Sequence, residues 1–358
     1  MRRPDQEPAI AIDLFAGAGG LSLGLTDAGF EVGAALDNDP VAVRTYTGIL
    51  GSHIICAPIE EISAAELMRR AGVRKGECRL VAGGPPCQGF SLQRRGNRVD
   101  VRNQLILQYA RMIEEIRPAY FLMENVAGLL TKHGTPFLYE LQNRVIPLGY
   151  AIHLELLDTA DYGVPQRRRR ALLVGERITD DAGNFSFSNV ERGRLSTVRD
   201  AIGDLPSPPE DGTVHPEFAN HFREGRLAAI NIERIKHVPQ GGGREHLPDH
   251  LQLACHRNNK GHRHMDVYGR LAWDEPSVTL TARFDSFTRG RFGHPVENRS
   301  ITIREGARIQ TFPDWFHFCG SREDQARQVG NAVPPLLARK LGEAIMFGDR
   351  TGYRSLAA

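Results

Sequence analysis

The sequence predicts an α/β protein with a doubly wound, mostly parallel sheet and a second, smaller region that is rich in loops. In the first half of the 358 residues, apolar runs of strand length alternate with helix-compatible segments. That alternation is typical of strand–helix–strand units, which build parallel sheets. From about residue 185 to 322 the alternation stops and Pro, Gly, His and Arg become frequent, which predicts the second region.

The expected strands end in glycines or polar residues. Ligands of doubly wound sheets bind at the carboxyl ends of the strands, so these ends are candidate site positions. A glycine turn, AGAGG, and a helix-compatible stretch follow the first strand. A further helix is expected over 103–116, because its apolar residues recur with helical spacing. The expected strands are 9–15, 31–39, 80–84, 119–126 and 170–177.

The irregular stretch in the second half of the chain predicts that the protein has two domains. Loops rich in proline and glycine are expected at 204–216 and 240–250. A last helix is expected to open at Pro334 and Pro335, because proline is favoured in the first turn of a helix. The larger domain is expected at 1–190 together with 323–358, and the smaller domain at 191–322.

The composition is that of an ordinary soluble globular protein, with 41% hydrophobic and 25% charged residues. No apolar run reaches the ~18–20 residues of a membrane span, and the N-terminal MRRPDQEPAI lacks the apolar core of a signal peptide. We therefore expect a cytosolic protein with no membrane partner. The net charge of +2 is too small to indicate nucleic-acid binding by itself.

The five cysteines predict neither a disulfide framework nor a zinc site. Their number is odd, and no two of them form a CxxC pair. The stretch CHRNNKGHRH places Cys255 near His256, His262 and His264, but this spacing matches no zinc module. We expect no bound metal.

The segment DLFAGAGGLSLG (13–24) combines a strand end, a glycine turn and a helix start. Such a turn brings backbone N–H groups and the positive end of a helix close to an anionic ligand. Ser22 stands where a dinucleotide fingerprint has its third glycine, and Asp37 closes the next strand, where a carboxylate can bind ribose hydroxyls. The turn predicts either a nucleoside site of unspecified kind or only close packing of a helix on a strand.

Three further segments carry candidate chemistry. In GGPPCQGFS (83–91) two prolines fix the backbone before Cys87. A free cysteine is usually a small buried hydrophobe, whereas this rigid setting favours a nucleophile. Glu124 follows an apolar run and is expected to be half buried, while the arginine run at 167–170 fits a solvated face or a phosphate patch.

Together and in this order, these segments resemble the DNA (cytosine-5)-methyltransferases of bacterial restriction–modification systems. The matching blocks are DLFAGAGGLSLG, GGPPCQGFS, ENVAGLL, DYGVPQRRRR, ITIREGARIQTFP and QVGNAVPP, and they span residues 13 to 335. The resemblance implies the fold of the S-adenosylmethionine-dependent methyltransferases. It also implies that the larger domain is catalytic and binds the cofactor, and that the smaller one contains the target-recognition region.

The resemblance implies methylation of cytosine C5 in double-stranded DNA, with S-adenosylmethionine as cofactor and S-adenosylhomocysteine as product. Cys87 would add to C6 of a flipped-out cytosine, and Glu124 would hold its N3 edge. Arg168 would reach the O2 side of the base, and Arg170 would support the catalytic loop or the flipped base. Enzymes of this kind belong to the class DNA (cytosine-5-)-methyltransferase.

The implied cofactor residues lie at the strand ends. Phe15 would stack on the adenine, the glycine turn would bind the methionine end, and Asp37 would bind the ribose. Pro58 stands where the family has an acidic residue that contacts the adenine amino group, so that contact is left open between a main-chain group and Glu60. The cofactor set is Phe15, Ala16, Gly17, Gly19, Gly20, Leu21, Asp37, Asn38, Pro85, Leu105, Asn331 and Ala332.

The DNA contacts are expected from the polar segment 91–104 and from the second region. The stretch from Cys255 to Arg291 contains seven Lys and Arg residues but only four Asp and Glu residues. This local excess of positive charge is suited to binding phosphates. We expect a monomer acting on DNA in the nucleoid. Its expected partner in the system is a cognate restriction endonuclease that acts on the same site, with no binding between the two required. The candidate DNA-binding residues are Gln88, Ser91, Arg94, Arg95, Arg102, Arg257, Lys260, Arg263, Arg283, Arg289 and Arg291.

Three alternatives remain open at this point. A branch of the same family methylates cytosine in tRNA, although its signature after the Pro-Pro-Cys step differs. A catalytically inactive DNA-binding relative is a second alternative, which the intact Cys87, Glu124 and Arg168 argue against. A nucleotide-dependent oxidoreductase would share only the glycine turn and would leave the other blocks unexplained.

Overall fold

The computed structural model of the protein describes residues 8–86, 104–178, 185–223, 225, 227–254 and 265–354. The chain divides into two compact units. Unit 1 contains residues 1–162, 169–192 and 333–358, and unit 2 contains residues 163–168 and 193–332. Unit 2 extends to Ala332, beyond the predicted boundary at 322, because helix α10 (Arg322–Asn331) packs against α9 (Ile303–Ile309) of the same unit.

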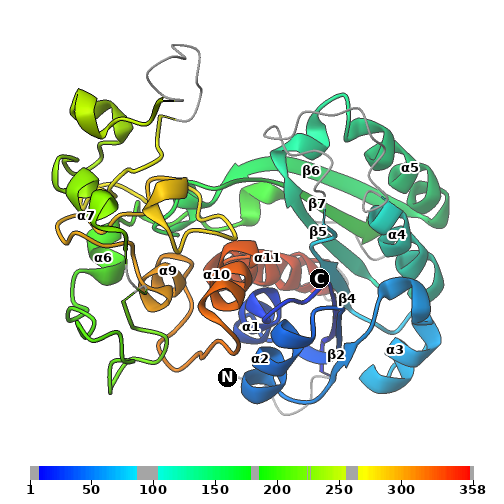
Figure 1. The fold of residues 1–358 in the computed structure, drawn as a ribbon. Coiled ribbons are helices and arrows are strands. Elements are labelled where there is room, and N and C mark those ends of the chain that lie inside the picture. Colours follow the sequence, from blue (N-terminus) through cyan, green and yellow to red (C-terminus); the bar gives the residue numbers. More distant parts are fainter. Residues whose placement is uncertain are drawn as a thin grey trace. The chain divides into compact units, whose positions relative to one another are not determined.

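Unit 1 is built on one seven-stranded sheet with the order β3-β2-β1-β4-β5-β7-β6 (Figure 1). The pairs within β3-β2-β1-β4-β5 are parallel, whereas β7 is antiparallel to both β5 and β6. The predicted mostly parallel, doubly wound sheet is therefore confirmed, with an antiparallel edge added. The strands are β1 (Ile10–Leu14), β2 (Glu31–Asp37), β3 (Ile54–Cys56), β4 (Leu80–Gly83), β5 (Tyr120–Val126), β6 (Tyr150–Asp158) and β7 (Arg169–Arg177).

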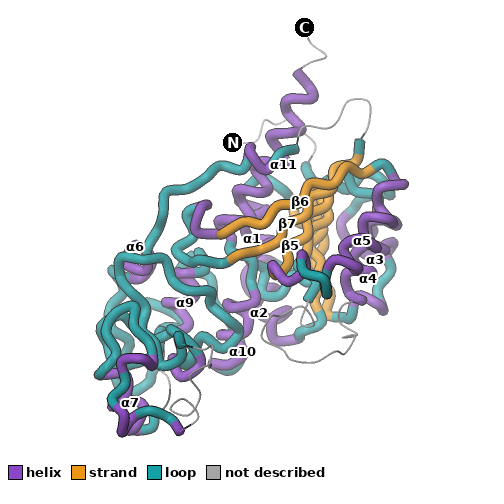
Figure 2. The backbone as a smooth tube through the Cα atoms, turned by 90° about the horizontal axis from the view of Figure 1, so that it is seen from above, coloured by secondary structure: helices purple, strands orange, loops and turns teal. Residues whose placement is uncertain are grey.

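Helices cover both faces of this sheet. In Figures 1 and 2, α3, α4 and α5 lie on one face, and α1, α2 and α11 lie on the other. No helix in the described ranges is long and apolar enough to cross a membrane. The helices of unit 1 are α1 (Gly20–Asp27), α2 (Pro40–Leu50), α3 (Ala64–Ala71), α4 (Leu105–Ile116), α5 (Thr135–Val145) and α11 (Pro335–Arg354).

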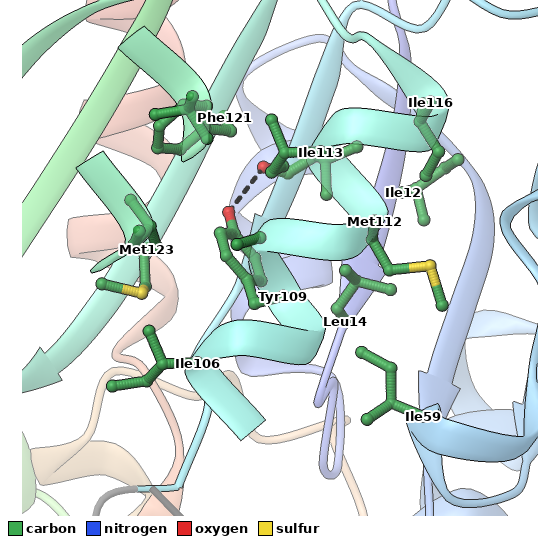
Figure 3. Packing of buried hydrophobic residues seen from close by; sticks show 14 of the residues in the cluster. Ile12, Leu14, Ile59, Ile106, Tyr109, Met112, Ile113, Ile116, Phe121 and Met123 are labelled. Carbon is green, nitrogen blue, oxygen red and sulfur yellow. Dashed lines mark hydrogen bonds between the residues drawn. The ribbon is translucent and has the colours of Figure 1, made fainter. Parts of the chain in front are cut away.

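Helix α4 shows how the apolar pattern of the sequence builds the core of unit 1. Ile106, Tyr109, Ile113 and Ile116 recur at spacings of three and four residues and are fully buried against the sheet (Figure 3). The Tyr109 hydroxyl is buried with them, and its one proton is shared between the carbonyl oxygens of two strand residues at 3.0 and 2.9 Å. The helix thereby fixes β4 and β5 side by side, and these two strands carry site residues at their ends.

Unit 2 has few regular elements among its described residues. Its helices are short, and its β-structure consists of isolated bridges. Three helices begin with a capping box, in which the N-cap hydroxyl and the acidic third residue bond each other's backbone N–H groups. The helices are α6 (Val198–Ile202), α7 (Ala229–Lys236), α9 and α10.

Candidate active site

The carboxyl ends of β1, β2, β4 and β5 meet at one edge of the sheet in unit 1. The glycine turn follows β1, Asp37 closes β2, Gly84 and Pro85 follow β4, and Glu124 lies near the end of β5. Strand pairing therefore brings together four segments that are as much as 111 residues apart in sequence, from Asp13 to Glu124. Such an edge is where doubly wound sheets bind their ligands.

The glycine turn requires backbone conformations that favour glycine. Phe15, Gly17 and Gly19 have φ values of 61°, 55° and 100°, all in the left-handed region. A Cβ atom built on Gly17 would meet no atom within 4 Å, so the turn has open space on that side. A Cβ atom on Gly19 would lie 2.9 Å from the Tyr46 ring, so the other side is packed on α2. The backbone of the turn is therefore open to a ligand at Gly17 and packed against α2 at Gly19.

Asp37 ties the glycine turn to the end of β2. Its Oδ2 accepts the Gly17 N–H at 2.8 Å, and its Oδ1 accepts the Asp39 N–H at 2.8 Å. Burial raises the pKa of the Asp37 carboxyl, and the backbone donors oppose that rise. Each carboxylate oxygen has a second lone pair, so the group can still accept from a ligand hydroxyl.

Asp13, the first residue of the glycine-turn motif, lies beneath the turn and was not assigned a role from the sequence. It is fully buried, and its Oδ2 accepts a hydrogen bond from the Ser22 hydroxyl at 2.6 Å. Burial raises the pKa of the Asp13 carboxyl to about 7. The sequence did contain a signal for this contact. Ser22 replaces the third glycine of the dinucleotide fingerprint, and a serine hydroxyl at that position can donate a hydrogen bond to a side chain near the end of the strand.

Glu124 and Arg170 form an ion pair at the same edge, with 2.7 Å between Arg170 Nε and Glu124 Oε1. Strand register explains the pair. Glu124 lies opposite Leu172 on the antiparallel strand β7, and Arg170 is two residues from Leu172, so both side chains are on one face of the sheet. Both side chains are largely buried, which strengthens their attraction relative to a surface pair.

The loop after β4 lies directly against this ion pair. A Cβ atom on Gly84 would be 3.5 Å from Glu124 Oε2, and Asn125 Nδ2 donates to the Pro85 carbonyl oxygen at 3.1 Å. Pro85 is buried and two residues before Cys87. The backbone that leads to Cys87 is therefore anchored to the end of β5, although Cys87 itself lies outside the described residues.

Arg168 differs from the expectation that it reaches the base beside Glu124. It is buried in unit 2, where its Nη1 donates to the carbonyl oxygens of Leu280 and Gly330 at 3.1 and 3.0 Å. It is Arg170, two residues later, that pairs with Glu124. Alternate residues of the QRRRR run thus have different partners, which the run itself did not reveal.

The remaining predicted residues are placed as follows. Leu105 begins α4 and packs against the core, whereas Asn38 is exposed after β2. Asn331 ends α10 in unit 2, and the Ala332 carbonyl oxygen accepts from Gln310 Nε2 at 2.6 Å. Outside the described residues lie Gln88, Ser91, Arg94, Arg95, Arg102, Arg257, Lys260 and Arg263.

Of the predicted DNA contacts, three arginines fall within described parts of unit 2. Arg289 is exposed, Arg291 is partly buried, and Arg283 pairs with Glu323 at 2.7 Å. The charge of Arg283 is therefore shared within the unit. In the described ranges no three His, Cys, Asp or Glu side chains are grouped to hold a metal ion, and the cluster from Cys255 to His264 lies outside those ranges.

Pro58, the departure from the family pattern, lies just after β3 at the same edge and is exposed. Glu60, the alternative acceptor for the adenine amino group, is exposed two residues later. Both are in unit 1, and within the described ranges no hydrogen bond joins either of them to the glycine turn.

Comparisons with known proteins show which family the chain is similar to. The family model of the C-5 cytosine-specific DNA methylases matches residues 10–346. The Type II methyltransferase M.XorII of Xanthomonas oryzae pv. oryzae is 37% identical, over 94% of this chain and 84% of its own. M1.HphI of Haemophilus parahaemolyticus, also a Type II methyltransferase, is 35% identical, over 94% of this chain and 86% of its own.

Solved structures support the same fold. A protein encoded within an E. coli prophage superposes with a TM-score of 0.69 and 26% identity, covering 95% of this chain and 99% of its own. The S. pombe Dnmt2 methyltransferase has a TM-score of 0.63 at 18% identity, covering 95% of this chain and 99% of its own, and so supports the fold alone.

The chain belongs to the C-5 cytosine-specific DNA methylase family. It is therefore a DNA (cytosine-5)-methyltransferase, as the motif blocks predicted. Membership implies catalysis that depends on S-adenosylmethionine and a DNA substrate.

Proposed function

We propose that the enzyme methylates C5 of a flipped-out cytosine in a specific duplex DNA sequence, through a covalent bond between Cys87 Sγ and C6. The observation that carries this proposal is the Glu124–Arg170 ion pair beside the anchored loop that leads to Cys87. A nucleophile, an acid for N3 and a cation for the polar edge of the base are then gathered at one edge of the sheet.

The reaction needs a nucleophile because cytosine C5 is itself a poor one. The Cys87 thiolate adds to C6, the π pair of the C5–C6 bond forms a C4–C5 double bond, and N3 takes a proton from Glu124. Glu124 holds N3 and its proton, and Arg170 keeps the Glu124 carboxyl oriented and faces the O2 side. After C5 has gained a methyl group, N3 returns its proton to Glu124, and loss of the C5 proton to water restores the C5–C6 double bond and expels the thiolate.

The residues of unit 1 fit the cofactor. S-adenosylmethionine, when bound, supplies an electrophilic methyl group. The open side of Gly17 leaves room for the methionine end, Asp37 can accept ribose hydroxyls, and Phe15 stands at the start of the turn for the adenine. We assign cofactor binding and catalysis to unit 1, and target recognition to unit 2 with Arg289 as its exposed candidate contact.

This assignment revises the roles of the two arginines. Arg170 has the contact with Glu124 that acting on the base requires, whereas Arg168 Nη1 is engaged by two carbonyl oxygens. Arg170 therefore lies beside the base, and Arg168 holds residues 163–168 within unit 2.

The covalent step is tested with Cys87→Ser and with duplex DNA that carries 5-fluorocytosine at the target. Wild type should form an SDS-resistant complex with the fluorinated DNA, since fluorine does not leave as a proton does. Cys87→Ser should lose methylation and the trapped complex, yet bind S-adenosylhomocysteine as wild type does. Turnover of Cys87→Ser at the wild-type rate would contradict the covalent mechanism.

The substrate is tested by offering duplex DNA and tRNA to the same enzyme with tritiated cofactor. Methyl transfer to DNA alone is expected, and transfer to tRNA alone would contradict the proposal. Bisulfite sequencing of DNA from a host that expresses the protein identifies the modified cytosine. The curated relatives are Type II methyltransferases, so we propose that a cognate endonuclease cuts the same sequence and is blocked by this modification.

A further inference from the structure

A chain of hydrogen bonds runs from beneath the glycine turn to the far side of α2. The Ser22 hydroxyl is 2.6 Å from Asp13 Oδ2, the Tyr46 hydroxyl is 2.9 Å from Ser22 Oγ, and His53 Nε2 is 2.8 Å from the Tyr46 hydroxyl. Each member comes from a different element, namely β1, α1, α2 and the loop before β3. Asp13, Ser22 and Tyr46 are buried, whereas His53 is partly exposed.

When the Asp13 carboxyl is ionised, counting protons gives the direction of this chain. Ser22 uses its one hydroxyl proton to donate to Asp13, and Tyr46 uses its one proton to donate to Ser22. The Tyr46 oxygen can then only accept from His53, so the His53 ring must be protonated at Nε2. Burial, with Arg70 nearby, lowers the pKa of His53, which favours this neutral ring.

Tyr46 also supports the glycine turn through apolar contacts. Its ring lies where a Cβ atom on Gly19 would be only 2.9 Å away, and it packs in one cluster with Ala16. The His53 ring stands edge-on to it, with 5.3 Å between ring centroids. Ring packing thus holds the turn from behind, and the hydroxyl holds Ser22 at the start of α1.

The outer end of the chain opens on a cavity of about 520 Å³ between α1 and α2. His53, Tyr46, Ser22 and Thr26 are among its lining residues. None of these residues was singled out by the sequence as part of the site, apart from Ser22 as a departure from the glycine fingerprint. His53, the last donor in this chain of hydrogen bonds, therefore lies at the wall of the cavity.

We propose that Tyr46 and His53 are positioning residues for the cofactor: they hold Ser22 on Asp13 and so preset the backbone of the glycine turn that receives S-adenosylmethionine. The proposal rests on the proposed cofactor site at that turn. Because the turn has three residues in the left-handed region, a support that keeps it in place before binding lowers the ordering cost of binding.

The test is the Kd for S-adenosylhomocysteine, measured by calorimetry on the full chain without DNA. Tyr46→Phe keeps the ring under Gly19 and removes the hydroxyl, so the Kd should rise about tenfold. His53→Leu should raise it to a similar extent. His53→Gln can place an amide N–H toward Tyr46, so it should restore most of the wild-type affinity.

The matched control is Tyr139→Phe on α5. It removes a hydroxyl from a tyrosine that is 60% exposed and takes no part in this chain of hydrogen bonds. Its Kd should equal that of wild type. The Kd of the double variant Tyr46→Phe/His53→Leu should exceed that of either single variant by no more than about twofold, since one substitution already breaks the chain of hydrogen bonds.

A Kd within twofold of wild type in Tyr46→Phe, together with a lowered melting temperature, would overturn the proposal in favour of a merely structural role. If Tyr46→Phe does not fold, equal affinities of His53→Leu and His53→Gln overturn it instead. A wild-type protein that binds no S-adenosylhomocysteine, yet is folded, would contradict the proposed cofactor site itself and this inference with it.

Discussion

Units 1 and 2 satisfy their buried backbone groups by different means. Unit 1 pairs them in a seven-stranded sheet and in helices, whereas unit 2 is mostly loop between short helices (Figure 2). All the arginines that are buried in the described ranges, Arg168, Arg244, Arg270, Arg299 and Arg304, belong to unit 2. A guanidinium group has five donors in a rigid fork, so one side chain can bond several loop carbonyls.

Two of these arginines show the principle. Arg304 is fully buried and donates to the carbonyl oxygens of Ala219, Pro313 and Phe316. Arg270 likewise donates to several carbonyls, among them that of Val238 at 2.8 Å. Burial lowers the pKa of Arg304 to about 10, which reflects the cost of placing a charge there. Irregular backbone that is buried needs such donors in place of a sheet ladder.

The largest expected effect is that of removing Arg304. Arg304→Met leaves three carbonyl oxygens without their donor, so the free energy of unfolding should fall by about 3–5 kcal/mol. Both tryptophans of the chain, Trp273 and Trp315, lie in unit 2, so urea unfolding followed by tryptophan fluorescence reports on this unit. Arg289→Met, at an exposed arginine of the same unit, should change it by less than about 0.5 kcal/mol. Equal effects of the two substitutions would refute the role of buried arginines.

Two fully buried carboxylates should give the units opposite responses to pH. In unit 2 Glu305 is buried, which alone would raise its pKa, but its bonds to Arg299 lower the pKa to about 2. Its contribution to stability is present above its ordinary value of 4.5 and is lost as the pH falls toward 2. The stability difference between wild type and Glu305→Gln should therefore shrink over that window, up to roughly 3 kcal/mol.

In unit 1 the sign is reversed, because burial raises the pKa of Asp13 from 3.8 to about 7, and its hydrogen bonds to Ser22 offset only part of that rise. Its contribution is present below pH 3.8 and is lost as the pH rises to 7. Asp13→Asn should remove that decline. Far-UV circular dichroism during urea unfolding at pH 4 to 8 measures it, and an unchanged decline in Asp13→Asn would contradict the assignment.

At the site, Glu124→Gln should lower kcat about 100-fold, because it removes the acid that serves N3. The Kd of Glu124→Gln for S-adenosylhomocysteine should stay within about twofold of the wild-type value. As a control, Glu155→Gln at an exposed position of β6 should leave both kcat and this Kd unchanged. Arg170→Ala should behave like Glu124→Gln, whereas Arg168→Ala should lower the fluorescence-monitored stability of unit 2. The opposite pattern would return the site role to Arg168.

The smallest expected effect concerns the packing of α1 on α11. A Cβ atom on Gly24 would collide with the Pro335 carbonyl oxygen, so Gly24→Ala should destabilise unit 1 by about 1–3 kcal/mol. Gly48 lies in α2 with nothing within 4 Å of its Cβ position, so Gly48→Ala should stabilise the helix by up to about 1 kcal/mol. Thermal unfolding by circular dichroism compares the two, and a neutral Gly24→Ala would show that the helices can separate.

Much of unit 1 could be predicted from the sequence because its elements carry local signals. The apolar runs near β1, β2, β4, β5 and β7 became strands, and the helical spacing over 103–116 became α4. Strand β6 was missed because its burial is mixed, with Leu154 and Glu155 both exposed at the sheet edge. An edge strand lacks the continuous apolar run of a buried one.

By itself the sequence determined the family, the alternation of strands and helices, and the segments that carry the chemistry, since each depends on neighbouring residues. Only the tertiary structure decided that Arg170 pairs with Glu124, because that depends on the register of two antiparallel strands about 45 residues apart. It also decided that Tyr46 and His53 stand behind the glycine turn. Side chains meet across elements through packing, which no local pattern records.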